Sequence, residues 1–285
     1  MAKFNNMKTV ISASRRTDIP AFYLPWFMSK IRTGSVDVIN PFNRNQVRTV
    51  DLSADKVAWI VFWSRNYAPL LMEKDAFAAY QLFFHFTILS PSLMEKAGIP
   101  LSRAVHQAQE LSRIYGADHI TWRYDPVVFW KDGAHIRTNF KADDFRMLCR
   151  ELSAAGLSRC YTSIAYPYNK FIKRFNEKYP QLELSIPGIE QENAVVSRMV
   201  DIASEYEIKV YSCCTERLLS IPGVHPASCI DGALFNRLSK SEKVSVIVRP
   251  TRKGCRCTES VDIGDYLNQP CPFGCIYCYA NPLWK

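Results

Sequence analysis

The sequence lacks long apolar segments and repetition, and these absences narrow its class. No apolar run approaches the roughly 20 residues that a membrane-spanning helix requires. Residues 1–8 are polar and lack the hydrophobic stretch of a secretory signal. Internal repeats and low-complexity tracts are also missing. We therefore expect a soluble, cytoplasmic protein with no membrane partner, in a reducing compartment where the ten cysteines do not form a disulfide framework.

A long basic run is missing too, although the chain is basic. Its 36 Lys and Arg residues exceed its 27 Asp and Glu residues, which gives a formal charge of +9. This balance favours polyanionic partners such as nucleic acid. The alternative is an excess spread thinly over solvated surfaces, because the basic clusters are short and lie at residues 15–16, 170–174 and 249–256. The histidines form no H-x3-H or H-E-x2-H pattern, so a mononuclear histidine metal site is not indicated.

Alternating apolar runs and helical patterns predict an α/β fold with a parallel sheet. The expected strands are residues 9–13, 57–63, 82–89, 119–124, 160–165 and 209–213. Apolar residues at helical spacing predict helices over residues 101–114 and 194–203, and residues 36–52 are expected to form a hairpin. These elements suit a partial (β/α)6-type, TIM-like barrel with its active-site groups at the C-terminal strand ends. We expect the barrel to span residues 1–240 and a cysteine-rich segment, residues 241–285, to pack on its mouth.

Three cysteines near the C-terminus carry the strongest chemical signal. Cys271, Cys275 and Cys278 have the spacing C-x3-C-x2-C, and Tyr277 directly precedes the third thiol. Three thiolates in one loop can ligate three irons of a [4Fe–4S] cluster and leave the fourth iron open to a small molecule. A zinc knuckle usually offers paired C-x2-C half-sites and four ligands, which this triplet does not. A cluster is therefore favoured over zinc or unligated thiols.

A second group of cysteines precedes the triplet. Cys255, Cys257, Cys229 and either Cys213 or Cys214 provide four thiols, which are enough for a second [4Fe–4S] cluster or a structural zinc. Their spacing is not diagnostic, and the alternative is that they are buried free thiols. The remaining cysteines, at positions 149 and 160, are expected to pack in the core.

The tail loop resembles the signature of the radical S-adenosylmethionine (SAM) superfamily. Its ending, Tyr-Cys-Tyr-Ala, is similar to the spore-photoproduct-lyase-like branch, and the chain also resembles the DUF1848 group, which carries the same terminal cysteines. Residues 12–19, 61–66, 84–88 and 122–127 are similar, in this order, to segments of that branch. In that superfamily the cysteine loop follows the first strand, so the resemblance implies a circular permutation. A strand within residues 260–266 would then lie beside residues 9–13 and lead into the loop.

The resemblance also implies cofactors and roles for single residues. Thr17 matches a hydroxyl that contacts SAM, Arg65 matches a lysine and could grip the methionine carboxylate, and Asp18 would orient Thr17 or the ribose. Tyr277 would flank the adenine. The alternatives are an N-cap for Thr17, a surface ion pair for Arg65 and loop packing for Tyr277.

The chain departs from the branch at one catalytic position. The lyases have a hydrogen-donating cysteine two residues before the SAM-contacting hydroxyl, and Arg15 stands there in this chain. Thymine-dimer repair is therefore not implied, and Arg15 suggests an anionic substrate or the SAM carboxylate nearby. Arg123 and Asp125 are candidates for a second polar pair in the barrel mouth, or for a structural ion pair.

The expected function is that of a radical SAM enzyme. Electrons from a flavodoxin or ferredoxin would reach the cluster, and cleavage of SAM would give a 5′-deoxyadenosyl radical that abstracts hydrogen from an unknown substrate. The alternative is a zinc or iron–sulfur module that binds nucleic acid without SAM chemistry.

Overall fold

The computed structural model describes residues 7–239 and 242–285. Its main feature is an eight-stranded sheet in which every neighbouring pair is parallel. The order across the sheet is β12 (Val224–Pro226), β11 (Lys209–Ser212), β9 (Arg159–Thr162), β6 (Ile120–Arg123), β5 (Gln81–Thr87), β4 (Val57–Ser64), β1 (Thr9–Ser12) and β13 (Val261–Asp262). No pairing joins β12 to β13 within the described residues, so the sheet has two edges rather than the closed outline of a barrel.

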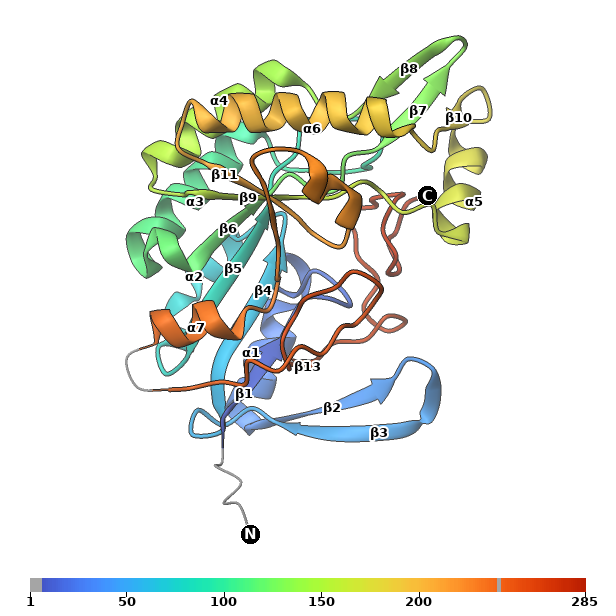
Figure 1. The fold of residues 1–285 in the computed structure, drawn as a ribbon. Helices are drawn as coiled ribbons and strands as arrows, with labels where there is room; N and C mark the ends of the chain where they lie inside the picture. Colours follow the sequence, from blue (N-terminus) through green and yellow to red (C-terminus); the bar gives the residue numbers. More distant parts are fainter. Residues whose placement is uncertain (1–6, 240–241) are drawn as a thin grey trace.

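The expected neighbourhood of the chain's head and tail is confirmed. Strand β13 pairs in parallel with β1, with Ile11 opposite Val261 and Ser12 opposite Asp262. The Ile263 amide donates to the Ser12 carbonyl at 3.1 Å and extends this pairing. Read from β13, the strands then follow one another across the sheet in chain order. The tail therefore supplies the strand that precedes β1 in space (Figure 1).

The strand count and the domain boundary need comment. All six expected barrel strands are present within two or three residues of their expected ends, and the strand expected within residues 260–266 is β13. Strand β12 was not expected, and it brings the parallel sheet to eight strands. The boundary expected between residues 240 and 241 lies outside the described residues, as does most of the N-terminal segment 1–8.

Five helices cover one face of the sheet, and α7 (Gly232–Leu238) with the segments around it covers the other (Figure 1). The first face packs against α1 (Leu24–Thr33), α2 (Ala68–Met72), α3 (Leu101–Tyr115), α4 (Ala142–Ala154) and α6 (Ile189–Ser204). On the second face, Trp59 and Phe83 pack against Phe235 of α7, with ring centroids 5.0 and 5.2 Å apart. Cys213, Cys229, Cys255 and Cys257 are buried in that second cluster.

The remaining elements are peripheral. Strands β2 (Ser35–Asn40) and β3 (Asn43–Asp51) form the expected hairpin, which projects from the molecule in Figure 1. A small antiparallel sheet has the order β10 (Glu183–Leu184), β7 (Phe129–Asp132) and β8 (His135–Thr138), and α5 (Asn169–Lys178) packs near it. Single turns of helix lie at η1 (Ile19–Tyr23), η2 (Lys74–Phe77), η3 (Ala117–His119) and η4 (Glu216–Ser220).

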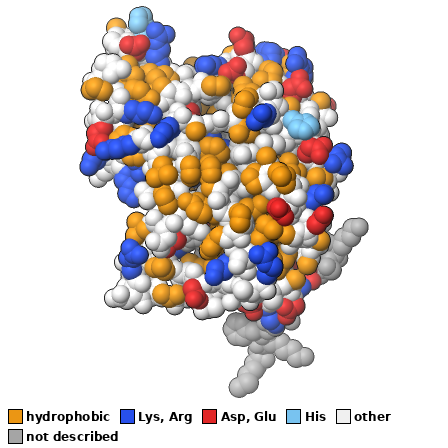
Figure 2. All heavy atoms as spheres, turned by 180° about the vertical axis from the view of Figure 1, so that it is seen from behind, with side chains coloured by type: hydrophobic (Ala, Val, Ile, Leu, Met, Phe, Trp, Pro, Cys, Tyr) orange, Lys and Arg blue, Asp and Glu red, His pale blue; other side chains and the backbone are white. Residues whose placement is uncertain are grey.

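The side of the molecule that faces away from the viewer in Figure 1 carries no single basic stripe. In Figure 2 hydrophobic side chains lie across the centre of this side, and Lys and Arg are scattered among Asp and Glu toward its margins. On this side the positive charge is therefore spread rather than patterned. No helix in the described ranges combines the length and apolar character needed to cross a membrane.

Candidate cysteine-rich site

The tail loop that carries the cysteine triplet is fixed by its own backbone bonds and by the loop after β5. The Cys271 amide donates to the Asn281 carbonyl at 2.9 Å, and the Cys278 amide donates to the Cys275 carbonyl at 3.1 Å. The Ile276 amide reaches the Met94 carbonyl at 2.9 Å. Gly274 has a φ of +64°, and a Cβ there would lie 2.6 Å from Lys96 Cβ. Glycine is therefore required at the turn between the first two thiols.

Arg174, on α5, holds the same loop from the other side. Its Nη1 donates to the carbonyl of Cys278 at 2.6 Å, and its Nη2 donates to the carbonyl of Ala280 at 3.2 Å. A third carbonyl, that of Ile276, lies 3.4 Å from Nη1. The residue is buried. A buried guanidinium bonded to three carbonyls acts as a clamp on the backbone around the third cysteine.

Asp18 joins the ends of strands β1 and β4 beneath this loop. Its carboxylate accepts from Ser64 Oγ at 2.7 Å, from the Arg65 amide at 3.0 Å and from the Ala21 amide at 3.1 Å. Burial outweighs these donors and raises the pKa of Asp18 to about 6. Asp18, rather than Thr17, is the N-cap of η1. The charge of Asp18 also helps to raise the pKa of Cys271, after the larger effect of burial, so the carboxylate faces the triplet.

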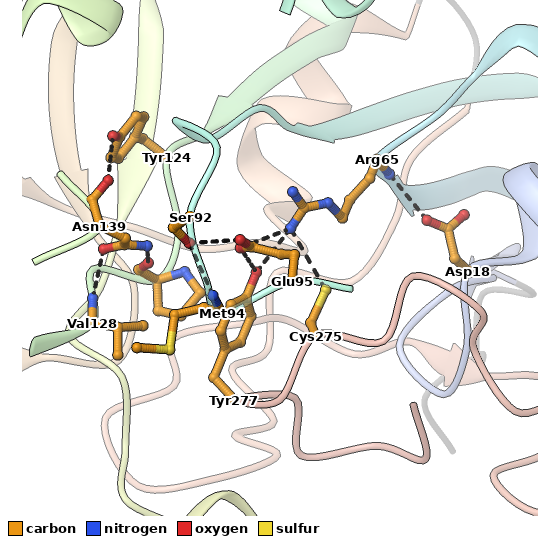
Figure 3. Close-up of polar contacts among 11 residues, drawn as sticks. Asp18, Arg65, Ser92, Met94, Glu95, Tyr124, Val128, Asn139, Cys275 and Tyr277 are labelled. Carbon is orange, nitrogen blue, oxygen red and sulfur yellow. Dashed lines mark hydrogen bonds and ion pairs between the residues drawn. The ribbon is translucent and has the colours of Figure 1, made fainter. Parts of the chain in front are cut away.

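Arg65 connects strand β4 to the tail loop (Figure 3). Its Nη1 donates to the Tyr277 hydroxyl at 2.9 Å and lies 3.2 Å from Glu95 Oε1 and 3.6 Å from Cys275 Sγ. Burial raises the pKa of the Cys275 thiol, and the guanidinium opposes this shift. The expected alternative of a surface ion pair is wrong, because the Arg65–Glu95 pair is largely buried.

Several buried polar atoms at this site have no protein partner. Among the described residues, Ser14 Oγ, Thr17 Oγ1 and Arg65 Nε are buried without a hydrogen bond. Buried donors and acceptors are usually satisfied, so these three atoms are candidates for binding a ligand. Arg65 Nη1 contacts both Tyr277 and Cys275, and Asp18 accepts from the Arg65 amide. The SAM-binding roles expected for Thr17, Asp18, Arg65 and Tyr277 stay predictions.

Arg15 lies toward the second group of cysteines. Its guanidinium is 3.3 Å from Asp262 Oδ1 and 5.4 Å above the ring of Trp63, and its carbonyl accepts from the Tyr279 hydroxyl at 2.6 Å. Although burial opposes the charge, Asp262 and the thiols of Cys257 and Cys229 raise the pKa of Arg15. Arg15 therefore lies between the tail loop and the second thiol group.

Arg123 and Asp125 form an ion pair at the end of β6. Both side chains are mostly buried, and Ser163 Oγ donates to the Asp125 carboxylate. Arg123 Nη1 also lies 3.0 Å from Cys229 Sγ. The structural ion pair considered from the sequence is therefore present, and it extends to the second group of thiols rather than to the triplet.

The second group contains five thiols rather than four. Cys213 Sγ is 3.3 Å from Cys229 Sγ and 3.9 Å from Cys214 Sγ, while Cys255 contacts both Cys214 and Cys257. Cys149 and Cys160 lie instead in the core on the helix-covered face, as expected. Over residues 7–239 and 242–285, no set of three or more His, Cys, Asp or Glu side chains already has the arrangement of a metal site. Each of the five thiols contacts two others, but the five sulfurs do not converge on one point.

Sequence reasoning missed three residues. These are Glu95 on the loop after β5, Arg174 on α5, and Arg252. The Nε atom of Arg252 lies 3.1 Å from Cys214 Sγ. Their contacts join segments that are far apart in the chain, and no local pattern announces them. The only signal was that Arg174 and Arg252 belong to the short basic clusters at residues 170–174 and 249–256.

The fold and the site define an α/β protein in which a cysteine-rich tail completes one edge of a parallel sheet and lies against its strand ends. The chain belongs to the family described as domain of unknown function DUF1848, whose model matches residues 10–280. No curated protein sequence matches the chain.

Two solved structures show low similarity. A D-hydantoinase has 8% identity and a TM-score of 0.31, over 59% of this chain and 38% of its own. The IOLI protein with a binding zinc atom has 10% identity and a TM-score of 0.33, over 82% of this chain and 66% of its own. The chain thus spans less than two thirds of the length of each.

Proposed function

We propose that this protein is a radical SAM enzyme whose sheet is circularly permuted. The observation that carries the proposal is the pairing of β13 with β1, which places the cysteine triplet after the strand that is first in space. The triplet then lies beside Asp18 and Arg65, which follow the next two strands of the sheet. A cofactor held there would sit at the C-terminal strand ends, where parallel α/β folds carry their sites.

The spacing of the three cysteines of the tail loop supports an iron–sulfur cluster with one open iron as the proposed cofactor. Cys271, Cys275 and Cys278 would ligate three irons, and the Arg174 clamp would keep their backbone in place. When bound, a reduced [4Fe–4S] cluster supplies the electron for reductive cleavage of SAM, and this chemistry supports hydrogen abstraction from a substrate. The electron would come from a flavodoxin- or ferredoxin-type partner.

Groups without protein partners are the candidates for holding SAM. Thr17 Oγ1 and Arg65 Nε are such groups among the described residues, and Arg65 also contacts Cys275 and Tyr277 of the tail loop. Arg65 Nη1 is already engaged by Tyr277 and Glu95, so Nε is the donor left to meet a carboxylate. Tyr277 would orient Arg65 through its hydroxyl in addition to flanking the adenine.

The substrate would enter on the side of Arg15, Arg123 and Asp125. Arg15 and Arg123 are buried cations next to the second thiol group, and each already pairs with one carboxylate. They would favour a substrate with anionic groups, of which a nucleotide or nucleic acid is one class.

The test is anaerobic reconstitution with iron and sulfide, followed by dithionite and SAM. We expect release of 5′-deoxyadenosine, and loss of that release in Cys271→Ala. The matched control is Cys149→Ala, which removes a buried thiol far from the loop and should leave the release unchanged. An intact cluster that yields no 5′-deoxyadenosine would defeat the proposal. It would leave a metal-cluster module that binds nucleic acid, which the formal charge of +9 favours.

A further inference from the structure

Five cysteine thiols form a closed ring of contacts on the face of the sheet that packs against α7. Cys213 Sγ lies 3.3 Å from Cys229 Sγ and 3.9 Å from Cys214 Sγ. Cys214 contacts Cys255, Cys255 contacts Cys257, and Cys257 contacts Cys229. Four sulfurs around a tetrahedral zinc ion lie about 3.8 Å apart, given a zinc–sulfur bond of about 2.3 Å. The two measured spacings lie on either side of that value.

Three separate segments bring these thiols together. Cys213 and Cys214 follow β11, Cys229 follows β12, and Cys255 and Cys257 lie on the segment that returns toward β13. Cys214 adopts a φ of +60°, which is unfavourable for a residue with a side chain. A Cβ at Gly254 would lie 3.1 Å from the Cys214 carbonyl oxygen. The backbone therefore accepts both strain and close approach to place Cys214 in the ring.

Cations surround the ring. Arg123 Nη1 lies 3.0 Å from Cys229 Sγ, and Arg252 Nε lies 3.1 Å from Cys214 Sγ. Arg15 faces Cys257 and Cys229 closely enough for their charges to interact. Arg252 has no carboxylate within ion-pair distance in the described part of the chain. The Ile230 amide adds a hydrogen bond to Cys257 Sγ at 3.4 Å. Neutral thiols do not need such an environment, but a cluster of thiolates does.

Cys149 and Cys160, which lie outside both cysteine groups, show the contrast. Both lie in the apolar core on the opposite face, and burial raises the pKa of each thiol. That is the environment of an inert core cysteine. Ring cysteines instead contact guanidinium groups, a backbone amide and one another, and Cys255 also lines a groove of about 460 Å³ together with Arg252. The groove supplies an entry path for a metal ion.

We propose that four of these five thiols ligate a second metal centre, separate from the tail loop. The sulfurs now contact in pairs rather than converge on one point, so ligation would require side-chain rotation without a change of fold. Thiolate-rich sites of this kind select zinc or iron–sulfur clusters. The bound centre would face Arg15, whose carbonyl accepts a hydrogen bond from Tyr279 of the tail loop. This inference does not depend on SAM chemistry at the triplet.

The experiment uses the full chain with all three tail thiols removed, as Cys271→Ala, Cys275→Ala and Cys278→Ala together. After anaerobic reconstitution with iron and sulfide, or with zinc alone, we expect this variant to retain about four irons with sulfide, or about one zinc, per chain. Adding Cys255→Ser and Cys257→Ser should lower the bound metal at least tenfold. Adding Cys149→Ala instead should leave it unchanged. Retention of iron with sulfide would identify the centre as an iron–sulfur cluster, and retention of zinc alone would identify it as a zinc site; either result supports the proposal.

A second measurement uses the protein without substitutions, so its result does not depend on whether the variants fold. Alkylation followed by mass spectrometry should find the ring cysteines protected, and a metal chelator should expose them. A triplet variant that binds no metal, together with alkylation that the chelator does not alter, would overturn the proposal. Metal bound at the ring without release of 5′-deoxyadenosine would contradict the proposed radical SAM function and would leave the second metal centre supported.

Discussion

The hydroxyl of Tyr277 donates to Glu95 Oε1 at 2.9 Å and accepts from Arg65 Nη1, also at 2.9 Å. This phenol is a side-chain link between the tail loop and the loop after β5, and Figure 3 shows its contacts with both charged groups. Glu95 is further held by Ser92 Oγ at 2.7 Å. The three side chains therefore form one buried, charge-assisted network rather than two separate contacts.

The network predicts a coupling between Tyr277 and Glu95. Tyr277→Phe should lower the free energy of unfolding by about 1–2 kcal/mol, because it removes two hydrogen bonds to charged groups and keeps the ring. Glu95→Gln should also destabilise, because the amide no longer balances the Arg65 charge. Denaturant unfolding of both single variants and the double variant should give an interaction energy of about 0.5–3 kcal/mol. Strict additivity would contradict the network.

Arg174 offers a test of the clamp on the tail loop. Arg174→Lys keeps the charge, but an ammonium group cannot reach three carbonyls with the planar fork of arginine. We expect faster amide hydrogen exchange across residues 271–280 and at least a several-fold loss of iron retained after reconstitution. Lys173→Ala, on the exposed side of the same helix, is the matched control and should change neither reading. Equal exchange in the two variants would refute the clamp.

The turn between the first two thiols predicts a specific glycine requirement. Gly274→Ala should destabilise the loop by more than the about 1–2 kcal/mol that a left-handed conformation costs, because the new Cβ would also meet Lys96 Cβ at 2.6 Å and the Leu283 carbonyl at 2.9 Å. Gly133→Ala is the matched control, with a φ of +59° and open space around its Cβ. Thermal unfolding of the two variants should separate the cost of the left-handed conformation, which both variants pay, from the cost of the close contacts, which only Gly274→Ala pays. Metal retention should fall only in Gly274→Ala. A smaller effect at Gly274 than at Gly133 would contradict the close packing.

The sequence predicted the strands well where burial made them continuous and apolar. Residues 57–64 and 81–87 are such runs, and each forms a strand inside the sheet. Strand β12 was missed because it is short, lies at an edge and contains His225 and Pro226. An edge strand tolerates proline, so the usual breaker signal misleads there. The pairing of β13 with β1 could be anticipated only through a resemblance, because nothing local in two residues marks a strand.

The cysteines of the candidate site could be predicted from the sequence, but the residues that hold and surround them could not. Cysteine spacing singled out the triplet, whereas the second group was noticed only because it offers enough thiols for a metal centre. The spacing could not show that Cys213 and Cys214 both contact the ring, or that Arg15 and Arg123 face the second group rather than the first. Contacts such as those of Glu95 and Arg174 depend on how distant elements pack, which single-sequence patterns do not encode.

The buried carboxyl group of Asp18 predicts a pH dependence of stability. Its pKa is about 6 in the folded protein against a reference of 3.8, because burial outweighs its hydrogen bonds. The folded state therefore binds this proton more tightly than the unfolded state does. The stabilisation that Asp18 contributes is fully present below about pH 4 and is lost as pH rises through about 6.

Asp18→Asn should remove this dependence in the metal-free protein. The free energy of unfolding of the native chain should fall, relative to Asp18→Asn, by on the order of 2–3 kcal/mol between pH 4 and pH 7. Urea unfolding at several pH values measures it. Asp75→Asn, at a highly exposed carboxylate, controls for the loss of one negative charge and should keep the native pH profile. Asparagine keeps an acceptor for Ser64 Oγ and the Ala21 amide but points an amide group at the Arg65 amide, so a constant destabilisation is expected in addition. Parallel profiles for the native chain and Asp18→Asn would show that Asp18 stays ionised, and the three donors, rather than burial, would then control its charge.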